Sequence, residues 1–334
     1  MKKLACLILS VVIVVPLMGF SQKYKDSDGK IKVAIVKMPY SGFPAIWHSF
    51  ELGLELSEGP EILEREGLSD VLEDLDCKLE RTTKVKLSEE EAKEFGVRNR
   101  LGIANGHLRD IVAANEKENY FTIGLQANDP SALGLLAGLQ HSGPGRRPLR
   151  VGMVWFDAHG DFNTPETSLS GMIGGMPVAI AAGLCLTRLR FQSGLDPALP
   201  TRYIVLAGVQ DTDPLEQDLI DRSDIEMITV EDIKTRSKNI HYQMKRLSSL
   251  TDIIYVHVDL VDIVDQKENP DVEFNFPEGP TSTDYAATLE IVYTYEKAAA
   301  LGIASYPVGQ DPNKMFLNAA FTIIKGAIKG LKRR

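Results

Sequence analysis

The stretch LRVGMVWFDAHGDFNTP, residues 149–165, decides the fold and gives the first sign of function. Its first seven residues form an apolar run of strand length, and Asp157 follows close behind that run. Side chains alternate along an extended chain, so Asp157, His159 and Asp161 point to the same side. Two carboxylates and an imidazole on one side suit a divalent ion such as Mn²⁺ or Zn²⁺. The alternative is a polar strand end whose side chains are hydrogen-bonded to loops.

Apolar runs of strand length alternate with helical patterns along the rest of the chain. Further strands are expected within residues 30–39, 77–87, 120–126, 201–209, 225–230, 252–264 and 303–308. Helices are expected within residues 59–75, 89–118 with a break at Gly96, 131–140, 177–189, 214–222, 230–250, 281–302 and from 312 onward. This alternation predicts one three-layer α/β/α domain, with a mostly parallel central sheet covered on both faces. The site of such a sheet is expected in the loops at the carboxyl ends of its strands.

The N-terminal residues 1–21 have the layout of a secretory signal peptide. Two lysines precede an apolar run from Leu4 to Val15, and the small residues Gly19 and Ser21 stand at −3 and −1 of a cut before residue 22. The apolar run is shorter than a transmembrane helix requires, and an uncleaved N-terminal anchor is the alternative. We therefore expect a mature domain of residues 22–334, secreted or periplasmic, without stable membrane insertion.

Composition restricts the partners of the chain. The 334 residues have a formal net charge of −9, and this acidity does not suggest a nucleic-acid surface. A mature chain would retain Cys77 and Cys185, which allow one disulfide but no disulfide framework.

A second acidic strand end, YVHVDLVD, occupies residues 255–262. In an extended chain His257, Asp259 and Val261 share one face, and Asp262 points the other way unless a bulge intervenes. Two acidic strand ends in one parallel sheet favour a bound cation, because clustered carboxylates are costly without one.

Residues 155–171, WFDAHGDFNTPETSLSG, resemble the signature of the arginase family of ureohydrolases, which hydrolyse guanidino compounds at a two-manganese site. The segments GPEILEREGLSDVLEDL, VLAGVQDTDPLE and VHVDL and the C-terminal helix follow in family order, so the resemblance covers about residues 30–332. DAHGDFNTP is a specific motif, whereas VHVDL alone is weak. The resemblance implies an arginase-like fold, and trimers or hexamers by analogy.

The resemblance also implies roles for individual residues. Carried over by position, the Mn²⁺ ligands would be Asp157, His159, Asp161 and Asp259. Asp157 and Asp259 would bridge two ions, and Asp161 would also be catalytic by holding the activated water. The residues that would contact a small amino-acid-like substrate are Asn163, Ser170, Asp213 and Glu216.

Four positions depart from the family pattern. Asp129 stands where the first metal-binding histidine is expected, and it can still bind a hard cation. Val261 stands at the position of a second aspartate, for which Asp262 substitutes only if the chain bulges. Gly174 replaces a proton-shuttling histidine, and Ser305 replaces a glutamate that grips the guanidinium group.

Two functions remain open from the sequence. One is an exported metal-dependent hydrolase of a non-peptide C–N bond in a small guanidino- or amino-acid-like substrate. The other is a catalytically impaired ureohydrolase-fold protein that binds a ligand or a metal. The intact motif at 157–163 and Asp259 favour the enzyme, and the four departures favour the binding module. The remaining histidines are expected at the surface or at helix ends: His48, His107, His141 and His241.

Overall fold

The computed structural model describes residues 23–42, 55–263 and 279–334, so the predicted signal peptide and His48 lie outside the described residues. Its strands are β1 (Ile31–Met38), β2 (Cys77–Lys84), β3 (Phe121–Gln126), β4 (Val151–Phe156), β5 (Ile204–Ala207), β6 (Glu226–Ile228), β7 (Ile253–Asp259) and β8 (Ala298–Ala304). They form one sheet in the order β2-β1-β3-β8-β7-β4-β5-β6, and every pairing between them is parallel.

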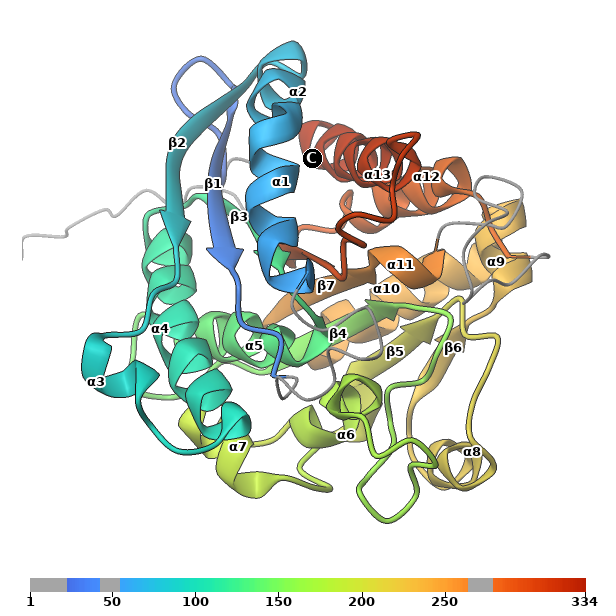
Figure 1. Cartoon of the computed structure of the whole chain (residues 1–334). Helices are drawn as coiled ribbons and strands as arrows, with labels where there is room; N and C mark the ends of the chain where they lie inside the picture. The colour runs from blue at the N-terminus through green and yellow to red at the C-terminus, as the bar shows by residue number, and fades with distance from the viewer. Residues whose placement is uncertain (1–22, 43–54, 264–278) are drawn as a thin grey trace, which may run out of the picture.

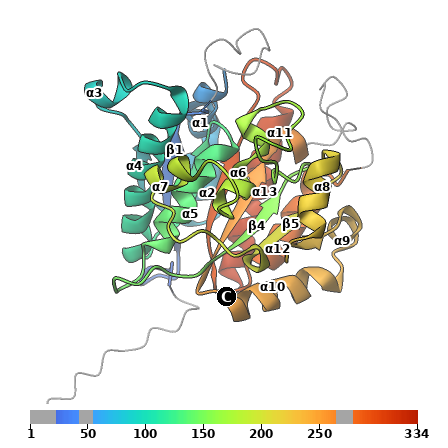
Figure 2. The same ribbon diagram turned by 90° about the horizontal axis from the view of Figure 1, so that it is seen from below.

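Helices cover both faces of this sheet (Figure 1). They are α1 (Gly59–Leu63), α2 (Ser69–Asp74), α3 (Glu89–Ala92), α4 (Val97–Lys117), α5 (Ala132–Gln140), α6 (Pro177–Ala181), α7 (Thr187–Gln192), α8 (Pro214–Asp221), α9 (Val230–Thr235), α10 (Lys238–Leu250), α11 (Leu260–Ile263), α12 (Ser282–Val292) and α13 (Met315–Lys332). Helices α1, α12 and α13 lie on one face, and α4 and α5 lie on the other (Figures 1 and 2).

The central strands are buried along their whole length, as the predicted α/β/α architecture requires. Every residue of β3, β4, β7 and β8 is buried, because helices cover each strand on both sides. Strand β2 lies at one edge of the sheet, and its polar sequence CKLERTTK leaves it partly exposed. The expected three-layer fold with a parallel sheet is therefore confirmed.

Four expected helices differ from the structure. The helix expected over 59–75 is kinked at Gly67, whose φ is 118°, between α1 and α2. The helix expected over 177–189 is two short helices, α6 and α7, because the intervening chain turns through left-handed conformations at Gly183 and Leu186. The helix expected over 230–250 is likewise interrupted, at Arg236 with φ of 52°. The helix expected over 281–302 ends at Val292, and the following alanines enter β8. Alanine has high helix propensity, but burial between β3 and β7 decides its conformation there.

The two cysteines within the described residues, Cys77 and Cys185, are both free. The disulfide that their number allows is therefore not formed. No helix among the described residues combines the length and apolarity needed to span a membrane.

The carboxyl ends of β3, β4, β5, β7 and β8 point to the same edge of the sheet, because all of these strands are parallel. The loops that leave these ends therefore meet there, and they contain most of the acidic residues singled out in the sequence.

Candidate metal centre

Asp157 follows the end of β4 and is held firmly from two sides. Its Oδ1 accepts a hydrogen bond from the backbone N–H of His159 at 2.8 Å, and its Oδ2 accepts one from the indole N–H of Trp155 at 3.2 Å. Only 1% of the Asp157 surface is exposed. Both oxygens are therefore oriented before any ligand binds.

Asp161 reaches the same site through an unusual backbone conformation. Its φ is +48°, in the left-handed region that few non-glycine residues adopt. The Asp161 carbonyl accepts a hydrogen bond from the N–H of Val178 at 3.0 Å, which fixes this turn against the start of α6. Carboxylate oxygens of Asp129, Asp157 and Asp161 lie within 4.8 Å of one another, close enough to share one ion. We call these three residues the first group.

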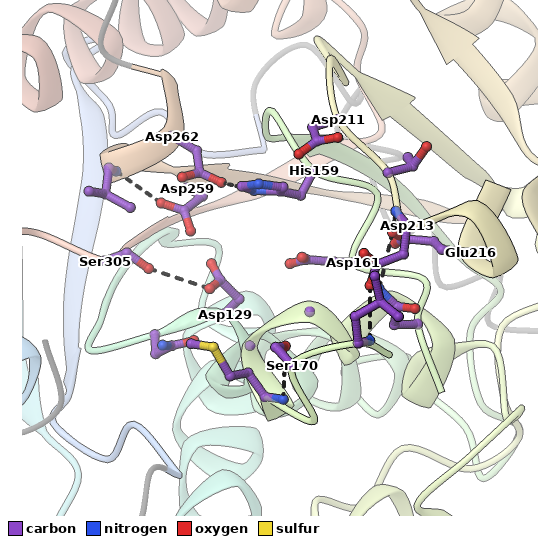
Figure 3. Close-up of a pocket in the computed structure, with 18 of the residues that line it drawn as sticks. Asp129, His159, Asp161, Ser170, Asp211, Asp213, Glu216, Asp259, Asp262 and Ser305 are labelled. Carbon is purple, nitrogen blue, oxygen red and sulfur yellow. Dashed lines mark hydrogen bonds and ion pairs between the residues drawn. The ribbon is translucent and has the colours of Figure 1, made fainter. Parts of the chain in front are cut away.

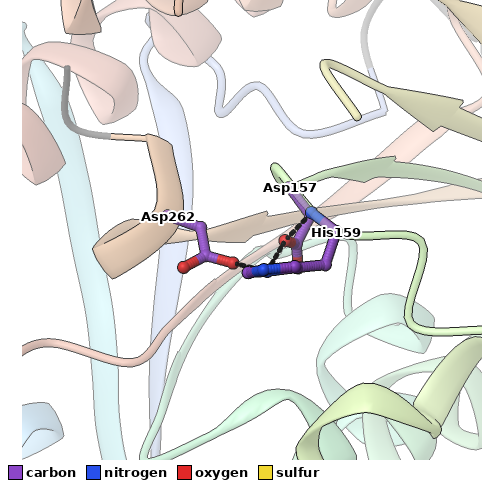
Figure 4. A group of neighbouring side chains, drawn as sticks. All are labelled: Asp157, His159 and Asp262. Carbon is purple, nitrogen blue, oxygen red and sulfur yellow. Dashed lines mark hydrogen bonds and ion pairs between the residues drawn. The ribbon is translucent and has the colours of Figure 1, made fainter. Parts of the chain in front are cut away.

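A second group consists of Asp157, His159 and Asp262, whose ligand atoms also lie within 4.8 Å of one another (Figure 4). The Nδ1 of His159 lies 3.6 Å from Asp157 Oδ1 and forms a short contact with Asp262 Oδ2. Asp157 belongs to both groups.

The expectation that Asp262 points away from the site unless the chain bulges was wrong. Strand β7 ends at Asp259, and the chain turns at once into α11 instead of bulging. Three residues after Asp259, the helical turn brings the Asp262 carboxylate to His159.

Asp259 lies between the two groups and faces the same cavity (Figure 3). Its Oδ1 accepts a hydrogen bond from the backbone N–H of Val261 at 2.9 Å. Val261, which stands where the family pattern has a second aspartate, therefore orients Asp259 through its backbone. Asp259 is not part of either close group in this structure.

The electrostatics of the cluster call for a cation. Burial, reinforced by the neighbouring carboxylates, raises the pKa values of Asp157, Asp161 and Asp259 well above the usual range of aspartate. Burial alone would lower the pKa of His159, but its bonds to Asp157 and Asp262 raise that pKa to about 12. Burial opposes ionisation of Asp262 too, yet its bond to His159 lowers the pKa. A divalent ion would neutralise the remaining carboxylates, and their hard oxygens suit Mn²⁺.

A cavity of about 370 Å³ opens above the two groups. Of the ten predicted site residues, those that line it are Asp129, His159, Asp161, Asn163, Ser170, Asp213, Glu216, Asp259 and Asp262. The tenth, Asp157, is not among the lining residues. The structure thus brings together segments that are far apart in the sequence.

Three of the predicted substrate contacts, Asn163, Asp213 and Glu216, are hydrogen-bonded to one another, and the hydroxyl of Ser170 accepts a hydrogen bond from the N–H of Met172 at 3.2 Å. The Asn163 amide donates to Asp213 Oδ2 and Glu216 Oε2, both at 3.1 Å. Glu216 is buried and also accepts hydrogen bonds from the N–H groups of Phe162 and Asp213 at 2.7 and 3.1 Å. Asn163 and Glu216 therefore join the motif loop to α8, whereas the exposed Ser170 lies at the rim of the cavity.

Sequence reasoning missed Asp211. This residue is exposed, lines the cavity, and is labelled with Asp213 in Figure 3. Its backbone N–H donates to Ala158 O at 3.0 Å, which fastens the loop after β5 to the motif. The same acidic loop that suggested Asp213 contains Asp211 two positions earlier, so the signal was present.

The departures Gly174 and Ser305 both line the cavity. Ser305 has a φ of +61°, and its hydroxyl donates to Asp129 Oδ2 at 3.4 Å. Among the described residues that line the cavity there is neither lysine nor arginine. The two positions where the family pattern has a histidine and a glutamate are therefore part of the site, but here they carry no imidazole and no carboxylate.

The other described histidines serve local structure, as expected. His107 contacts the Glu91 carboxylate at 2.9 Å, His141 contacts Gly194 O at 2.9 Å, and His241 contacts the Tyr295 hydroxyl at 2.8 Å. None of the three lines the cavity.

The profile of the Arginase family matches residues 54–326. The chain therefore belongs to the arginase family, whose members are hydrolases that act on guanidino C–N bonds and depend on two metal ions. It is 35% identical to the arginase of Entamoeba histolytica over 205 residues, which cover 59% of this chain and 66%, just under two thirds, of that enzyme. It is 26% identical to the arginase of Staphylococcus aureus strain COL over 293 residues, or 85% of this chain and 94% of that enzyme.

Solved structures show the same fold. The native structure of arginase from Bacillus caldovelox superposes with a TM-score of 0.74 and 23% identity, over 90% of this chain and 98% of that chain. The E. histolytica arginase in complex with L-ornithine superposes with a TM-score of 0.71 and 26% identity, over 89% of this chain and 98% of that chain.

Proposed function

We propose that this protein hydrolyses a non-peptide C–N bond in a small cationic guanidino- or amino-acid-like compound, using two Mn²⁺ ions. The observation that carries the proposal is the pair of ligand groups that share Asp157 at the base of an acidic cavity. Divalent ions in such a site lower the pKa of bound water and polarise the substrate.

The residues of the chain divide this work among them. The first group would hold one ion, and the second group would hold the other, with Asp259 facing both. Asp161 is the catalytic candidate, because its carboxylate lies in the first group and faces the cavity. Burial and the neighbouring Asp157 carboxylate raise the pKa of Asp161 above the usual range of aspartate.

The lining of the cavity supports a cationic substrate. Asp211 and Asp213 lie on its outer side, and no described lining residue offers a positive charge to a substrate carboxylate other than His159 in the second group. The E. histolytica relative was crystallised with L-ornithine, so a related fold accommodates an amino acid with a side-chain amine. With Ser305 at the guanidinium-gripping position, we expect arginine to be a poor substrate.

Metal content and product release test the proposal. The purified protein should bind two equivalents of Mn²⁺ and release urea, ammonia or formamide from a panel of guanidino and formimino compounds. Failure to bind Mn²⁺ after loading would contradict it. A second candidate, a binding module without turnover, is favoured by Gly174 and Ser305 in the lining. It predicts bound Mn²⁺ and ligand-induced stabilisation but no product.

We also propose export and self-association. Cleavage after residue 21 would give a mature protein that begins at residue 22, outside the cytoplasm. N-terminal sequencing of the protein from the native host tests this, and an intact Met1 in the cytoplasmic fraction would contradict it. Light scattering tests the trimer or hexamer expected by analogy.

A further inference from the structure

Behind the first group lies a row of buried polar side chains that the proposed function does not use. The Nε2 of His257 lies 3.0 Å from Asp129 Oδ1, and its Nδ1 lies 3.0 Å from the Tyr255 hydroxyl. The Tyr255 hydroxyl in turn lies 3.1 Å from the side-chain oxygen of Gln126. His257 and Tyr255 are fully buried, and Gln126 is 1% exposed. A row of this kind is costly to bury unless each member has a partner.

The sheet is built to admit this row. His257 lies on β7 between Trp155 on β4 and Gly302 on β8. Its ring stacks on the indole of Trp155, with centroids 3.6 Å apart and an interplanar angle of 10°. A Cβ at Gly302 would lie 2.0 Å from the Tyr255 hydroxyl and 2.3 Å from the Gln126 oxygen. The missing side chain on β8 therefore lets groups from the non-adjacent strands β3 and β7 meet.

The donors and acceptors in this row can be arranged in only one order. The Asp129 carboxylate only accepts when ionised, so His257 Nε2 must donate to it. In a neutral imidazole Nδ1 then accepts, and the Tyr255 hydroxyl must donate to Nδ1. Tyr255 cannot also donate to the Gln126 oxygen, and the Gln126 amide nitrogen is buried without a partner among the described residues. Exchanging the oxygen and nitrogen of that amide satisfies both, because the nitrogen then donates to Tyr255.

We propose that His257 is a positioning residue, held by Gln126 and Tyr255, whose Nε2–H fixes the Asp129 carboxylate for the ion of the first group. This inference rests on the proposed metal-dependent function. Asp129 stands in place of a directly bound histidine, and His257 supplies an imidazole one step behind it. Partners that orient metal ligands in this way are worth 10–100-fold in metal affinity.

Mn²⁺ titrations followed by electron paramagnetic resonance test the inference without turnover. His257→Phe keeps an aromatic ring on Trp155 but has no donor, so affinity for one of the two ions should fall about 10–100-fold. His257→Gln returns a donor and should recover part of that loss. Tyr255→Phe should lower the affinity for the same ion by a smaller factor. The surface control His241→Phe should change the affinity for neither ion.

The outcomes separate this inference from the proposed function. Folded His257→Phe or Tyr255→Phe protein with wild-type affinity for both ions would overturn the inference alone. Wild-type protein that binds no Mn²⁺ would overturn both. Nitrogen-15 spectra of histidine-labelled wild-type protein give a readout that needs no variant: His257 should carry its proton on Nε2, and a proton on Nδ1 would overturn the proposed direction.

Discussion

The ends of β4 and β7 supply ligands to the same centre in different ways. After β4, Asp157, His159 and Asp161 belong to one short motif, and local hydrogen bonds set their directions. At the end of β7, Asp259 is the last strand residue and faces the cavity, whereas Asp262 reaches the centre only because the strand gives way to α11. Alternation predicts the direction of Asp259, which still belongs to its strand. It does not set the directions of Asp161 and Asp262, which lie beyond the strands, where a left-handed residue and a helical turn decide them.

Removing the shared ligand should have the largest effect. Asp157→Ala deletes a member of both groups, so Mn²⁺ affinity at both positions should fall by more than about 100-fold, beyond the loss typical of an outer partner. Metal analysis after dialysis measures this. Retention of one full equivalent would show that the β4 end does not bridge two ions. Asp218→Ala, on the exposed side of α8, is the matched control.

Substituting a residue that belongs to only one of the two groups should have the next largest effect on Mn²⁺ binding. Asp129→Asn should remove one equivalent of Mn²⁺, and Asp262→Asn should remove the other, since each residue belongs to a single group. Both substitutions retain side-chain volume, so thermal unfolding of the loaded protein provides the control for folding. Full binding of both ions by Asp262→Asn would mean that the β7 end contributes through Asp259 alone.

The stabilisation by Mn²⁺ should increase with pH. Burial raises the pKa values of Asp157, Asp161 and Asp259 in the metal-free folded chain, so protons stay on these groups after the unfolded chain has released them. The metal-free fold therefore loses stability as pH rises through this window, while Mn²⁺ competes better for the site. The difference in Tm between Mn²⁺ and chelator should be larger at about pH 8 than at about pH 5.5. A larger difference at the lower pH would contradict the cluster electrostatics.

A smaller effect is expected from the indole behind the motif. Trp155→Phe removes the N–H that holds Asp157 Oδ2 but leaves a ring against His257. Mn²⁺ affinity should fall about 10-fold and the free energy of unfolding by about 1–2 kcal/mol. Denaturant unfolding of the metal-free protein, compared with Mn²⁺ titration, separates the two contributions.

The smallest effect is expected at the rim of the cavity. Ser170→Ala changes an exposed hydroxyl that belongs to neither group, so Mn²⁺ stoichiometry and Tm should remain unchanged. If Ser170 contacts substrate, KM should rise by up to about 10-fold at constant kcat, as expected for one lost hydrogen bond. A fall in kcat with unchanged KM would place Ser170 in the chemistry instead.

The fold could be predicted from the sequence to the level of its layers. The buried strand segment GMVWF is apolar throughout, and FTIGL is apolar except for Thr122, which is the pattern of a parallel sheet covered on both faces. The helix boundaries near Gly183, Arg236 and Val292 could not be predicted, because the residues there fit more than one conformation and the folded structure chose between them.

The sequence by itself determined the parallel α/β architecture, the family and the motif residues Asp157, His159 and Asp161 as candidate ligands. The architecture follows from apolar runs of strand length that alternate with helical patterns. The family and the motif residues follow from residue types whose chemistry is specific. Only the tertiary structure decided that Asp262 joins His159, that Asp129 meets Asp157 and Asp161, and that His257 stands behind Asp129. These contacts join residues more than 25 positions apart, and burial makes their distances matter: carboxylates brought together away from water need a cation or a donor.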